Sequence, residues 1–307
     1  MFRRKKHLKI NELSITGKIS IELLFLFTAL ICFIPFWLII SISFSTEADI
    51  AKYGFTLFPK HFTLDAYSYL FKGGSMRQII NAYLTTIFIT VSGTTLGVMV
   101  TAMAAYAMTR KLKYIRQISL FYSFAMMFSG GTVAWYMICT QVLHLTDTYF
   151  ALILPYAVSV WNVIMLRTFM KSSLPEEVFE SVKIDGGGEC VIFFKFVLPM
   201  SLPGLATIAL YLALHYWNDW YLSMMLINKA EIVTLQYYMQ KVMNSVMALI
   251  EFGLREGSSS VNLGEVEMPR ESIKMAICLI AIGPILLASP FLQKFFIKGI
   301  NSGAVKG

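Results

Sequence analysis

Residues 21–44 read IELLFLFTALICFIPFWLIISISF and contain one ionisable side chain, Glu22, near the beginning. A run of about 18 or more apolar residues is long enough to cross the hydrocarbon core of a membrane as a helix. The stretch is too long for the core of a signal peptide, and it lacks a small-residue cleavage site. The sequence therefore predicts a true membrane-spanning helix in this region.

The rest of the chain has the same apolar character. Of its 307 residues, 57% are hydrophobic and only 14% are charged, against roughly a quarter charged in a soluble domain. The mean hydropathy is +0.64. This composition excludes a soluble enzyme, a disordered chain and a free nucleic-acid-binding domain. We expect no nucleic-acid partner, and we assign the net charge of +8 to the loops that flank a membrane.

Six apolar stretches are candidates for membrane spans. Backbone polar groups cannot stay unpaired in lipid, so these stretches are expected to be helices. The sequence predicts an all-α integral membrane protein with spans near residues 21–44, 79–107, 118–140, 149–170, 199–227 and 273–293. Prolines inside them are expected to kink or end helices, at Pro35, Pro155, Pro284 and Pro290. Small residues at every fourth position of the second span allow another helix, from this chain or another subunit, to approach closely: Gly93, Gly97, Thr101 and Ala105.

Lysine and arginine residues predict the orientation in the membrane. With these six spans, 17 of the 26 lie on the side that holds both termini. The richer side is expected to be cytoplasmic. The predicted organisation is a cytoplasmic basic segment over 1–20, a six-helix domain over 21–293 and a cytoplasmic tail over 294–307. On the opposite side, an extracellular insert covers residues 228–272 and contains a helix near Leu235–Phe252.

The loop between the fourth and fifth spans, residues 174–197, is the cytoplasmic segment with an amphipathic pattern. A helix is predicted to begin with Pro175 in its first turn, capped by Ser172 or Ser173. The glycines at 186–188 end this helix and permit a sharp turn before a second short helix over Glu189–Val197. Its apolar face is predicted to consist of Phe179, Val182 and Ile184. Such a helix on the membrane surface fits a cleft on a partner protein.

This loop resembles the coupling-loop signature of permease subunits of bacterial ABC importers. The resemblance is closest to the sugar-importer branch related to maltose-type and oligosaccharide/aldouronate-type permeases. The matching residues are Glu180, Ser181, Val182, Asp185, Gly186, Leu198 and Pro199, followed by Pro203. Ser181 and Val182 stand where alanines are usual, and Gly187 stands where alanine is common. In the family, the loop docks into a groove on the ATPase subunit.

The resemblance implies a type I ABC importer permease fold and a role in the uptake of a sugar, expected to be an oligosaccharide. The implied partners are a second homologous permease subunit, two ABC ATPase subunits and an extracellular or lipid-anchored solute-binding protein, at the bacterial cell membrane. No G-x-x-x-x-G-K-[ST] sequence occurs in the chain, so it has no ATP site of that kind. ATP and Mg²⁺ are expected on the ATPase subunits. We expect a transport subunit without catalytic residues or a cofactor of its own.

Two further stretches agree with this resemblance. Trp217, Asn218, Asp219 and Trp220 resemble the W-N-D/E-aromatic motif of sugar permeases and are candidates for the substrate pathway. The alternative for Asp219 is a structural role, capping a broken helix or bonding to a neighbour. The C-terminal tail resembles the K-G-x-x-x-G-A-V-K-G ending of the same branch, which implies ATPase contact by Lys298, Gly299 and Lys306.

Two other classes of protein are alternatives. A membrane-embedded lipid-modifying enzyme needs convergent polar groups at one depth, and only His215 and Asp219 approach that arrangement. An ion-coupled secondary transporter usually needs more spans and internal repeats, and no repeat is visible. The histidines and cysteines are scattered, so neither a metal site nor a disulfide framework is expected.

Overall fold

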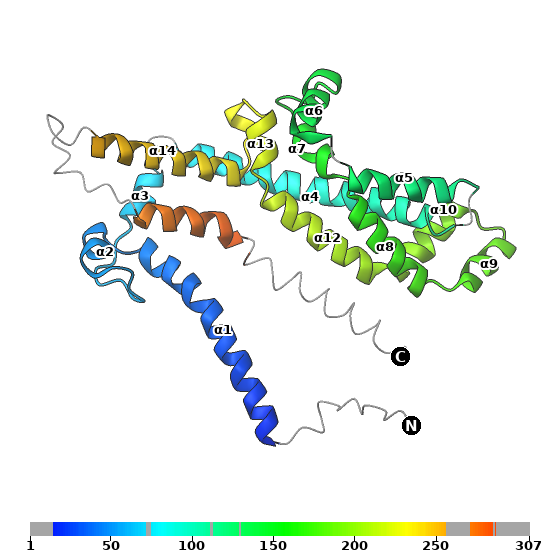
Figure 1. Cartoon of the computed structure of the whole chain (residues 1–307), viewed down its shortest axis with the longest axis horizontal. Coiled ribbons are helices and arrows are strands. Elements are labelled where there is room, and N and C mark those ends of the chain that lie inside the picture. Colours follow the sequence, from blue (N-terminus) through cyan, green and yellow to red (C-terminus); the bar gives the residue numbers. More distant parts are fainter. Residues whose placement is uncertain are drawn as a thin grey trace. The chain divides into compact units, whose positions relative to one another are not determined.

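The computed structural model describes residues 15–71, 75–110, 113–128, 130–255, 271–284 and 286. In these ranges the chain is built from helices, and strand pairing is limited to one isolated bridge between Ser45 and Phe62. The chain divides into two compact units, which are residues 1–71 with 249–280 and residues 72–248 with 281–307. Figure 1 labels the helices along the chain.

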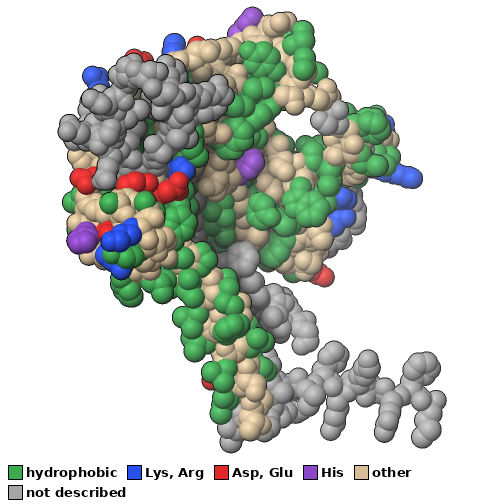
Figure 2. Space-filling model, turned by 60° about the vertical axis from the view of Figure 1, so that its left-hand side comes forward, with side chains coloured by type: hydrophobic (Ala, Val, Ile, Leu, Met, Phe, Trp, Pro, Cys, Tyr) green, Lys and Arg blue, Asp and Glu red, His purple; other side chains and the backbone are tan. Residues whose placement is uncertain are grey.

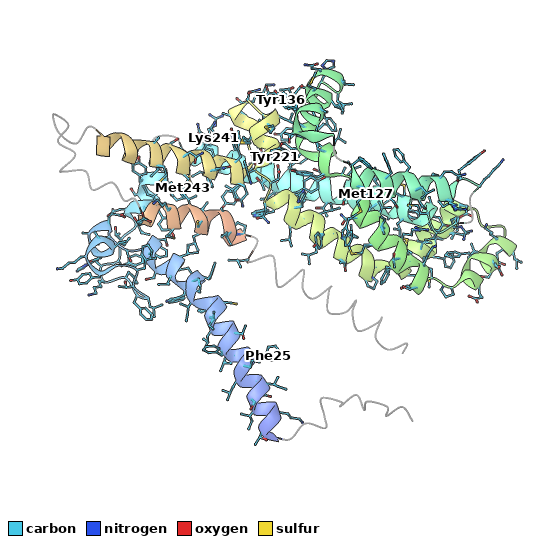
Figure 3. The ribbon with its side chains drawn as sticks, in the orientation of Figure 1. Phe25, Met127, Tyr136, Tyr221, Lys241 and Met243 are labelled. Atoms are coloured by element: carbon cyan, nitrogen blue, oxygen red, sulfur yellow. The ribbon has the colours of Figure 1, made fainter. Side chains whose placement is uncertain are left out.

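The first unit contains the long apolar helix α1 (Ile15–Ser43), which continues through Pro35 without ending. Among the described residues, none buries the most apolar part of α1. Hydrophobic side chains cover α1 in Figure 2, and Phe25 projects from it in Figure 3. A helix that is apolar on all sides and has no protein cover fits a lipid environment.

Two short helices follow α1 in this unit, α2 (Glu47–Tyr53) and α3 (Asp65–Phe71). The carboxylate of Glu47 accepts the backbone N–H of Glu271 at 2.9 Å and the hydroxyl of Ser272 at 3.2 Å. Residues 271–284 are helical, so Glu47 satisfies amide groups at the beginning of that helix, where a negative charge is favourable.

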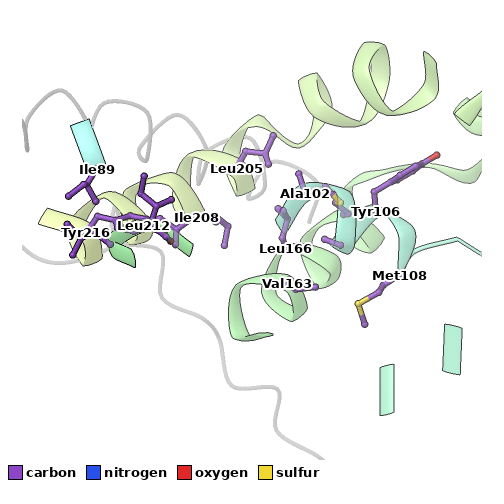
Figure 4. Close-up of a cluster of buried hydrophobic side chains, with 14 of the residues drawn as sticks. Ile89, Ala102, Tyr106, Met108, Val163, Leu166, Leu205, Ile208, Leu212 and Tyr216 are labelled. Atoms are coloured by element: carbon purple, nitrogen blue, oxygen red, sulfur yellow. The ribbon is translucent and has the colours of Figure 1, made fainter. Parts of the chain in front are cut away.

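The core of the second unit is formed by α4 (Ser75–Ala107), α8 (Val160–Ser173) and α12 (Leu202–Trp217). Figure 4 shows part of their buried cluster. Its fully buried side chains come from all three helices and include Ile89, Ala102, Val163, Leu166, Ile208 and Tyr216. These contacts fix the three helices against one another.

The small residues of α4 provide the close approach to α12. A Cβ atom at Gly93 would lie 2.6 Å from the ring of Tyr216, and one at Gly97 would lie 2.8 Å from Leu212. Thr101 and Ala105 continue this face and are also buried. The small-residue face of the second predicted span therefore packs against the fifth span of the same chain.

The described helices account for up to five membrane spans. Two are unbroken, Thr16–Ser43 and Met76–Ala107. Three are helix pairs bent by more than 40°: Ile115–Met127 with Gly131–Val142, Tyr149–Tyr156 with Val160–Ser173, and Glu189–Met200 with Leu202–Trp217. The second pair bends by 50° just after Pro155, where a proline was expected to interrupt a helix. The sixth predicted span, 273–293, lies partly outside the described residues, and Pro290 is among the residues not described.

The remaining helices form the bends and the connections of the second unit. They are α5 (Ile115–Met127), α6 (Gly131–Met137) with the π-helical turn Ile138–Val142, α7 (Tyr149–Ile153) with the 3₁₀ turn Leu154–Tyr156, α13 (Tyr221–Leu226) and the 3₁₀ turn Ala230–Ile232. The helix predicted near Leu235–Phe252 is present as α14 (Leu235–Arg255). Its first N–H, from Leu235, donates to the hydroxyl of Thr86 on α4 at 2.8 Å.

Asp147 fastens the loop before α7 to the segment after α13. Its carboxylate accepts the backbone N–H groups of Asn228 at 2.5 Å and Lys229 at 3.0 Å. These N–H groups, first that of Asn228 and then that of Lys229, lower the pKa of Asp147 because they stabilise the ionised carboxylate. The loop and the segment are therefore held together by a carboxylate that is charged at neutral pH.

Candidate functional site: the loop over residues 174–197

The predicted amphipathic helix is present as α9 (Glu176–Ile184). Its N-cap is Pro175, so the prediction that Ser172 or Ser173 caps it is wrong. Ser172 instead donates its hydroxyl to the carbonyl of Phe169, inside the last turn of α8. Serine close to a helix C-terminus can bond backward along its own helix, and here that contact is the one it makes.

The glycines after α9 form the predicted sharp turn. Gly186 has φ +79°, a left-handed conformation that favours glycine, and its N–H donates to the carbonyl of Lys183. Gly187 donates its N–H to the carbonyl of Val182 at 2.8 Å. A Cβ atom at Gly187 would lie 2.6 Å from Cγ1 of Val182. The turn therefore depends on glycine at both positions, for conformation at the first and for space at the second.

One face of α9 is packed against the end of α4. Phe179 is only 7% exposed, and its ring centroid lies 6.4 Å from that of Tyr106. The guanidinium of Arg110 lies 4.8 Å from the centroid of the Phe179 ring, in range of a cation–π contact. Val182 is half-buried on the same face. This face holds the helix to the helical bundle.

The opposite face of α9 is exposed. Ile184 is 85% exposed, so its predicted place on the apolar face is wrong. It follows Phe179 by five residues, which puts it about 140° away around the helix. Glu180 and Ser181, from the matched signature, and Asp185, directly after the helix, are exposed as well. We call Glu177, Glu180, Ser181 and Ile184, which share this face and are all exposed, the outer strip.

Glu189 joins the second half of the loop to both α4 and α9. Its carboxylate accepts the hydroxyl of Tyr106 at 2.5 Å, Nη2 of Arg110 at 3.0 Å and Nζ of Lys183 at 3.1 Å. Glu189 begins α10 (Glu189–Ile192), which continues into the π-helical turn Phe193–Val197. The helix predicted over Glu189–Val197 is thus present as an α-helix that continues into a π-helical turn. We call Glu189 and its three partners the Glu189 cluster.

The remaining signature residues do not join the outer strip. Leu198 and Pro199 lie in α11 (Leu198–Met200), directly before a bend of 78° into α12. Val197, next to them, is fully buried. These residues shape the entry of the chain into its fifth span. The predicted tail contacts, Lys298, Gly299 and Lys306, lie outside the described residues.

The four motif residues, 217–220, lie at the end of α12 and just before α13, and they differ in burial and in contacts. Asp219 is 8% exposed and accepts the hydroxyl of Tyr156 at 3.1 Å and the N–H of Leu222 at 3.3 Å. The second contact satisfies an N–H group in the first turn of α13, whose N-cap residue is Trp220, and is a structural contact of the kind considered for Asp219. Asn218 donates its side-chain amide to the carbonyl of Leu214.

The two tryptophans of this motif also differ in exposure. Trp217 is buried and donates its indole N–H to the carbonyl of Ala281 at 3.4 Å. Trp220 is 40% exposed and is the member of the motif with a large accessible ring. The four residues are therefore not arranged as one surface.

A cavity of about 350 Å³ lies beside this segment. Aromatic and polar side chains line it, including Tyr156, Ser159, Trp161, Asn162, Tyr211 and His215. Tyr156 connects it to Asp219 through the hydrogen bond already described and packs edge-on against His215, with ring centroids 4.2 Å apart. Aromatic rings with nearby hydrogen-bonding groups are a common lining of small-molecule sites.

Known proteins resemble this chain both in sequence and in fold. The permease protein YtcP of a polygalacturonan/rhamnogalacturonan transport system of Bacillus subtilis (strain 168) is 37% identical over 280 residues, which cover 91% of this chain and 94% of that protein. This chain belongs to the permease subunits of ABC sugar importers. Protein LplC of the same bacterium is 39% identical over 278 residues, covering 90% of both chains. No model of a known protein family matches the chain.

The fold of the permease agrees with this family. A bacterial ABC transporter involved in the import of the acidic polysaccharide alginate contains a chain with a TM-score of 0.74 and 25% sequence identity, covering 95% of this chain and all of that one. The permease is a helical membrane component of a transporter and not an enzyme. The alternatives of a lipid-modifying enzyme and an ion-coupled transporter are therefore set aside.

Proposed function

We propose that residues 174–197 couple this permease to an ATPase subunit through the outer strip of α9. The observation that carries this proposal is the exposure of Ile184 on a helix whose other face is fastened to the bundle by Phe179. An apolar side chain left in water beside the acidic and polar residues of the outer strip gains free energy when a partner covers it. Its neighbours Glu180 and Asp185 belong to the matched signature.

The proposed assembly has the permease as one half of a membrane pathway with a second homologous permease subunit. Two ABC ATPase subunits bind ATP and Mg²⁺ on the cytoplasmic side, and an extracellular or lipid-anchored binding protein delivers the substrate. In this arrangement the chain has six spans, both termini lie in the cytoplasm, and the tail residues Lys298, Gly299 and Lys306 add ATPase contacts. The lysine and arginine distribution supports this orientation.

The proposed substrate is an oligosaccharide derived from a polysaccharide. Support comes from the relatives, whose names refer to polygalacturonan/rhamnogalacturonan and alginate transport. Within the chain, the cavity beside Tyr156 and His215 and the exposed ring of Trp220 offer the aromatic surfaces on which sugar faces stack. Asp219 would position this region through Tyr156, and Trp217 and Asn218 would hold the end of α12.

The proposed mechanism transmits movement through contacts within the second unit. Closure of the ATPase subunits displaces α9, and the Glu189 cluster carries the displacement to the end of α4. α4 moves together with α12, because Tyr216 and Leu212 fill the space above Gly93 and Gly97. The two helices would then shift as one body, which is how packed helices pass on a displacement.

The direct test is to truncate Ile184 in the reconstituted importer. Ile184→Ala is expected to weaken binding of the ATPase subunits about tenfold, because an interface loses about 1.5 kcal/mol of apolar burial. Substrate-stimulated ATP hydrolysis should fall in parallel, while membrane insertion stays normal. The dissociation constant between the membrane subunits and the ATPase subunits is the measurement.

A matched control uses Phe194, an exposed apolar residue of the same loop that lies outside α9. Phe194→Ala is expected to change that dissociation constant by less than about twofold, since a residue outside the interface loses no burial there. Equal constants for the two variants would show that the outer strip is not the docking surface.

A further inference from the structure

A second cavity, of about 430 Å³, lies between the end of α4, α8 and the inner face of α9. Three cationic side chains line it, Arg110, Arg167 and Lys171. The rest of the lining is mostly apolar and consists of Met108, Ile115, Met170, Leu174 and Phe179, with Thr109. The lining of the cavity therefore combines cationic and apolar side chains.

Two of the three cationic side chains in this cavity have no acidic partner among the described residues. Among the described residues that line it, none is acidic. Arg167 donates Nε to the carbonyl of Met108 at 3.2 Å, which orients its guanidinium without neutralising it. Lys171 follows one turn later on α8 and is exposed. Arg110 pairs with the carboxylate of Glu189, and among the described residues Arg167 and Lys171 have no such partner.

We propose that this cavity binds the headgroup phosphate of an anionic phospholipid, with the glycerol and upper acyl chain against its apolar part. A basic pocket between the ends of membrane helices is the usual form of such a site. A free anion would leave the apolar lining without a partner. The chain's own ends are unsuited as occupants because both are cationic: residues 1–14 are rich in lysine and arginine, and residues 294–307 contain three lysines and no acidic residue.

The site would also influence coupling, and this consequence rests on the proposed function. Phe179 lines the cavity and is the residue that holds α9 to α4. Arg110 lines it as well, and it contacts both Phe179 and Glu189. A phosphate bound beside these groups would strengthen the packing of α9 against α4. Anionic lipid should therefore raise transport activity.

Lipid retention by the purified full chain is the decisive measurement. Native mass spectrometry compares retention of dioleoylphosphatidylglycerol with that of dioleoylphosphatidylcholine, and inorganic phosphate is tested as a competitor. We expect preferential retention of the anionic lipid. Lys171→Gln should lower it about fivefold, and Arg167→Gln with Lys171→Gln about thirtyfold. The assay contains no ATPase subunit and no sugar, so its outcome is independent of the proposed docking.

The matched control is Arg116→Gln, which removes an exposed arginine of α5 that does not line the cavity. Its retention of the anionic lipid should stay within about twofold of the unmodified chain, since an exposed charge outside the cavity lining is screened by water and salt. Lys171→Gln alone guards against misfolding of the double variant, because Arg167 also bonds to the backbone. Equal retention in Lys171→Gln and Arg116→Gln, or full displacement of lipid by inorganic phosphate, would overturn the proposal.

Discussion

Replacing Glu189 with alanine is expected to reduce substrate-stimulated ATP hydrolysis about thirtyfold while the permease still inserts into the membrane. The substitution removes the acceptor of Tyr106, Arg110 and Lys183 together. The charge-assisted contacts to this half-exposed carboxylate stabilise the packing of α9 against α4 by about 2 kcal/mol. This corresponds to a factor of about 30 in the ratio of packed to unpacked α9. The measurement is ATP hydrolysis by the reconstituted importer with and without its loaded binding protein.

Two variants separate the cluster from general effects of charge. Glu189→Gln retains an oxygen that can accept from Tyr106, and it should give an intermediate loss. Lys183→Gln removes one half-exposed partner and leaves the other two, so it should change coupling by less than about threefold. If Glu189→Ala couples as well as Lys183→Gln, the Glu189 cluster does not transmit movement to α4.

The positions of most membrane helices could be predicted because long apolar runs are a local property of the sequence. The runs at 79–107 and 149–170 correspond to α4 and to α7 with α8. The bends inside the runs are less visible. Pro155 marks the 50° bend between α7 and α8, and Pro199 and Pro203 flank the 78° bend before α12, but neither Pro nor Gly marks the π-helical turn Phe193–Val197. Changes in helical winding depend on tertiary packing rather than on residue type.

The loop over 174–197 shows where local reasoning fails. Glycine spacing was enough to predict the turn, because a left-handed φ at position 186 is a property of the backbone there. The direction of Ile184 follows from helix geometry, and counting apolar residues without their angles placed it on the wrong face. The partners of Glu189 could not be found this way. Tyr106 and Arg110 lie 83 and 79 residues earlier, and only the folded chain brings them together.

The motif at 217–220 illustrates a different limit. A buried aspartate in an apolar segment is compatible with both substrate binding and helix capping, and the sequence left both open. The contacts of Asp219 with Leu222 and Tyr156 are those of a residue that stabilises the first turn of α13 next to an aromatic cavity. Its effect on the substrate would then pass through Tyr156, whose position could not be deduced from a motif of neighbouring residues.

Two of the three departures of this chain from the coupling-loop signature, Val182 and Gly187, are linked by one contact. Gly187 replaces a common alanine, and Val182 replaces another. A Cβ atom at position 187 would come within 2.6 Å of Cγ1 of Val182, so a valine and an alanine cannot both fit without a shift. The larger residue at 182 and the smaller one at 187 therefore compensate for each other. Alanine at both positions, 182 and 187, would fill about the same space as this valine and glycine.

This compensation predicts a strongly non-additive pair of substitutions. Gly187→Ala alone is expected to distort the turn at a cost of about 2 kcal/mol, which would reduce coupling by about thirtyfold. Val182→Ala alone should have a small effect, because the side chain is only half-buried. The double variant should recover most of the coupling lost in Gly187→Ala. Recovery is expected to be incomplete, since the carbonyl oxygen of Val182 would still lie 2.9 Å from the new Cβ atom.

Hydrogen exchange of the α9 amides and ATP hydrolysis by the reconstituted importer provide the two measurements of this cycle. Both should show faster opening or weaker coupling in Gly187→Ala and a return toward the starting values in the double variant. An interaction energy of about 1 kcal/mol or more between the two positions would establish that they compensate, because residues in direct contact couple on that scale. Additive losses would mean that a Cβ atom at position 187 clashes with the backbone of Val182 rather than with its side chain, and that Val182 departs from the signature for another reason.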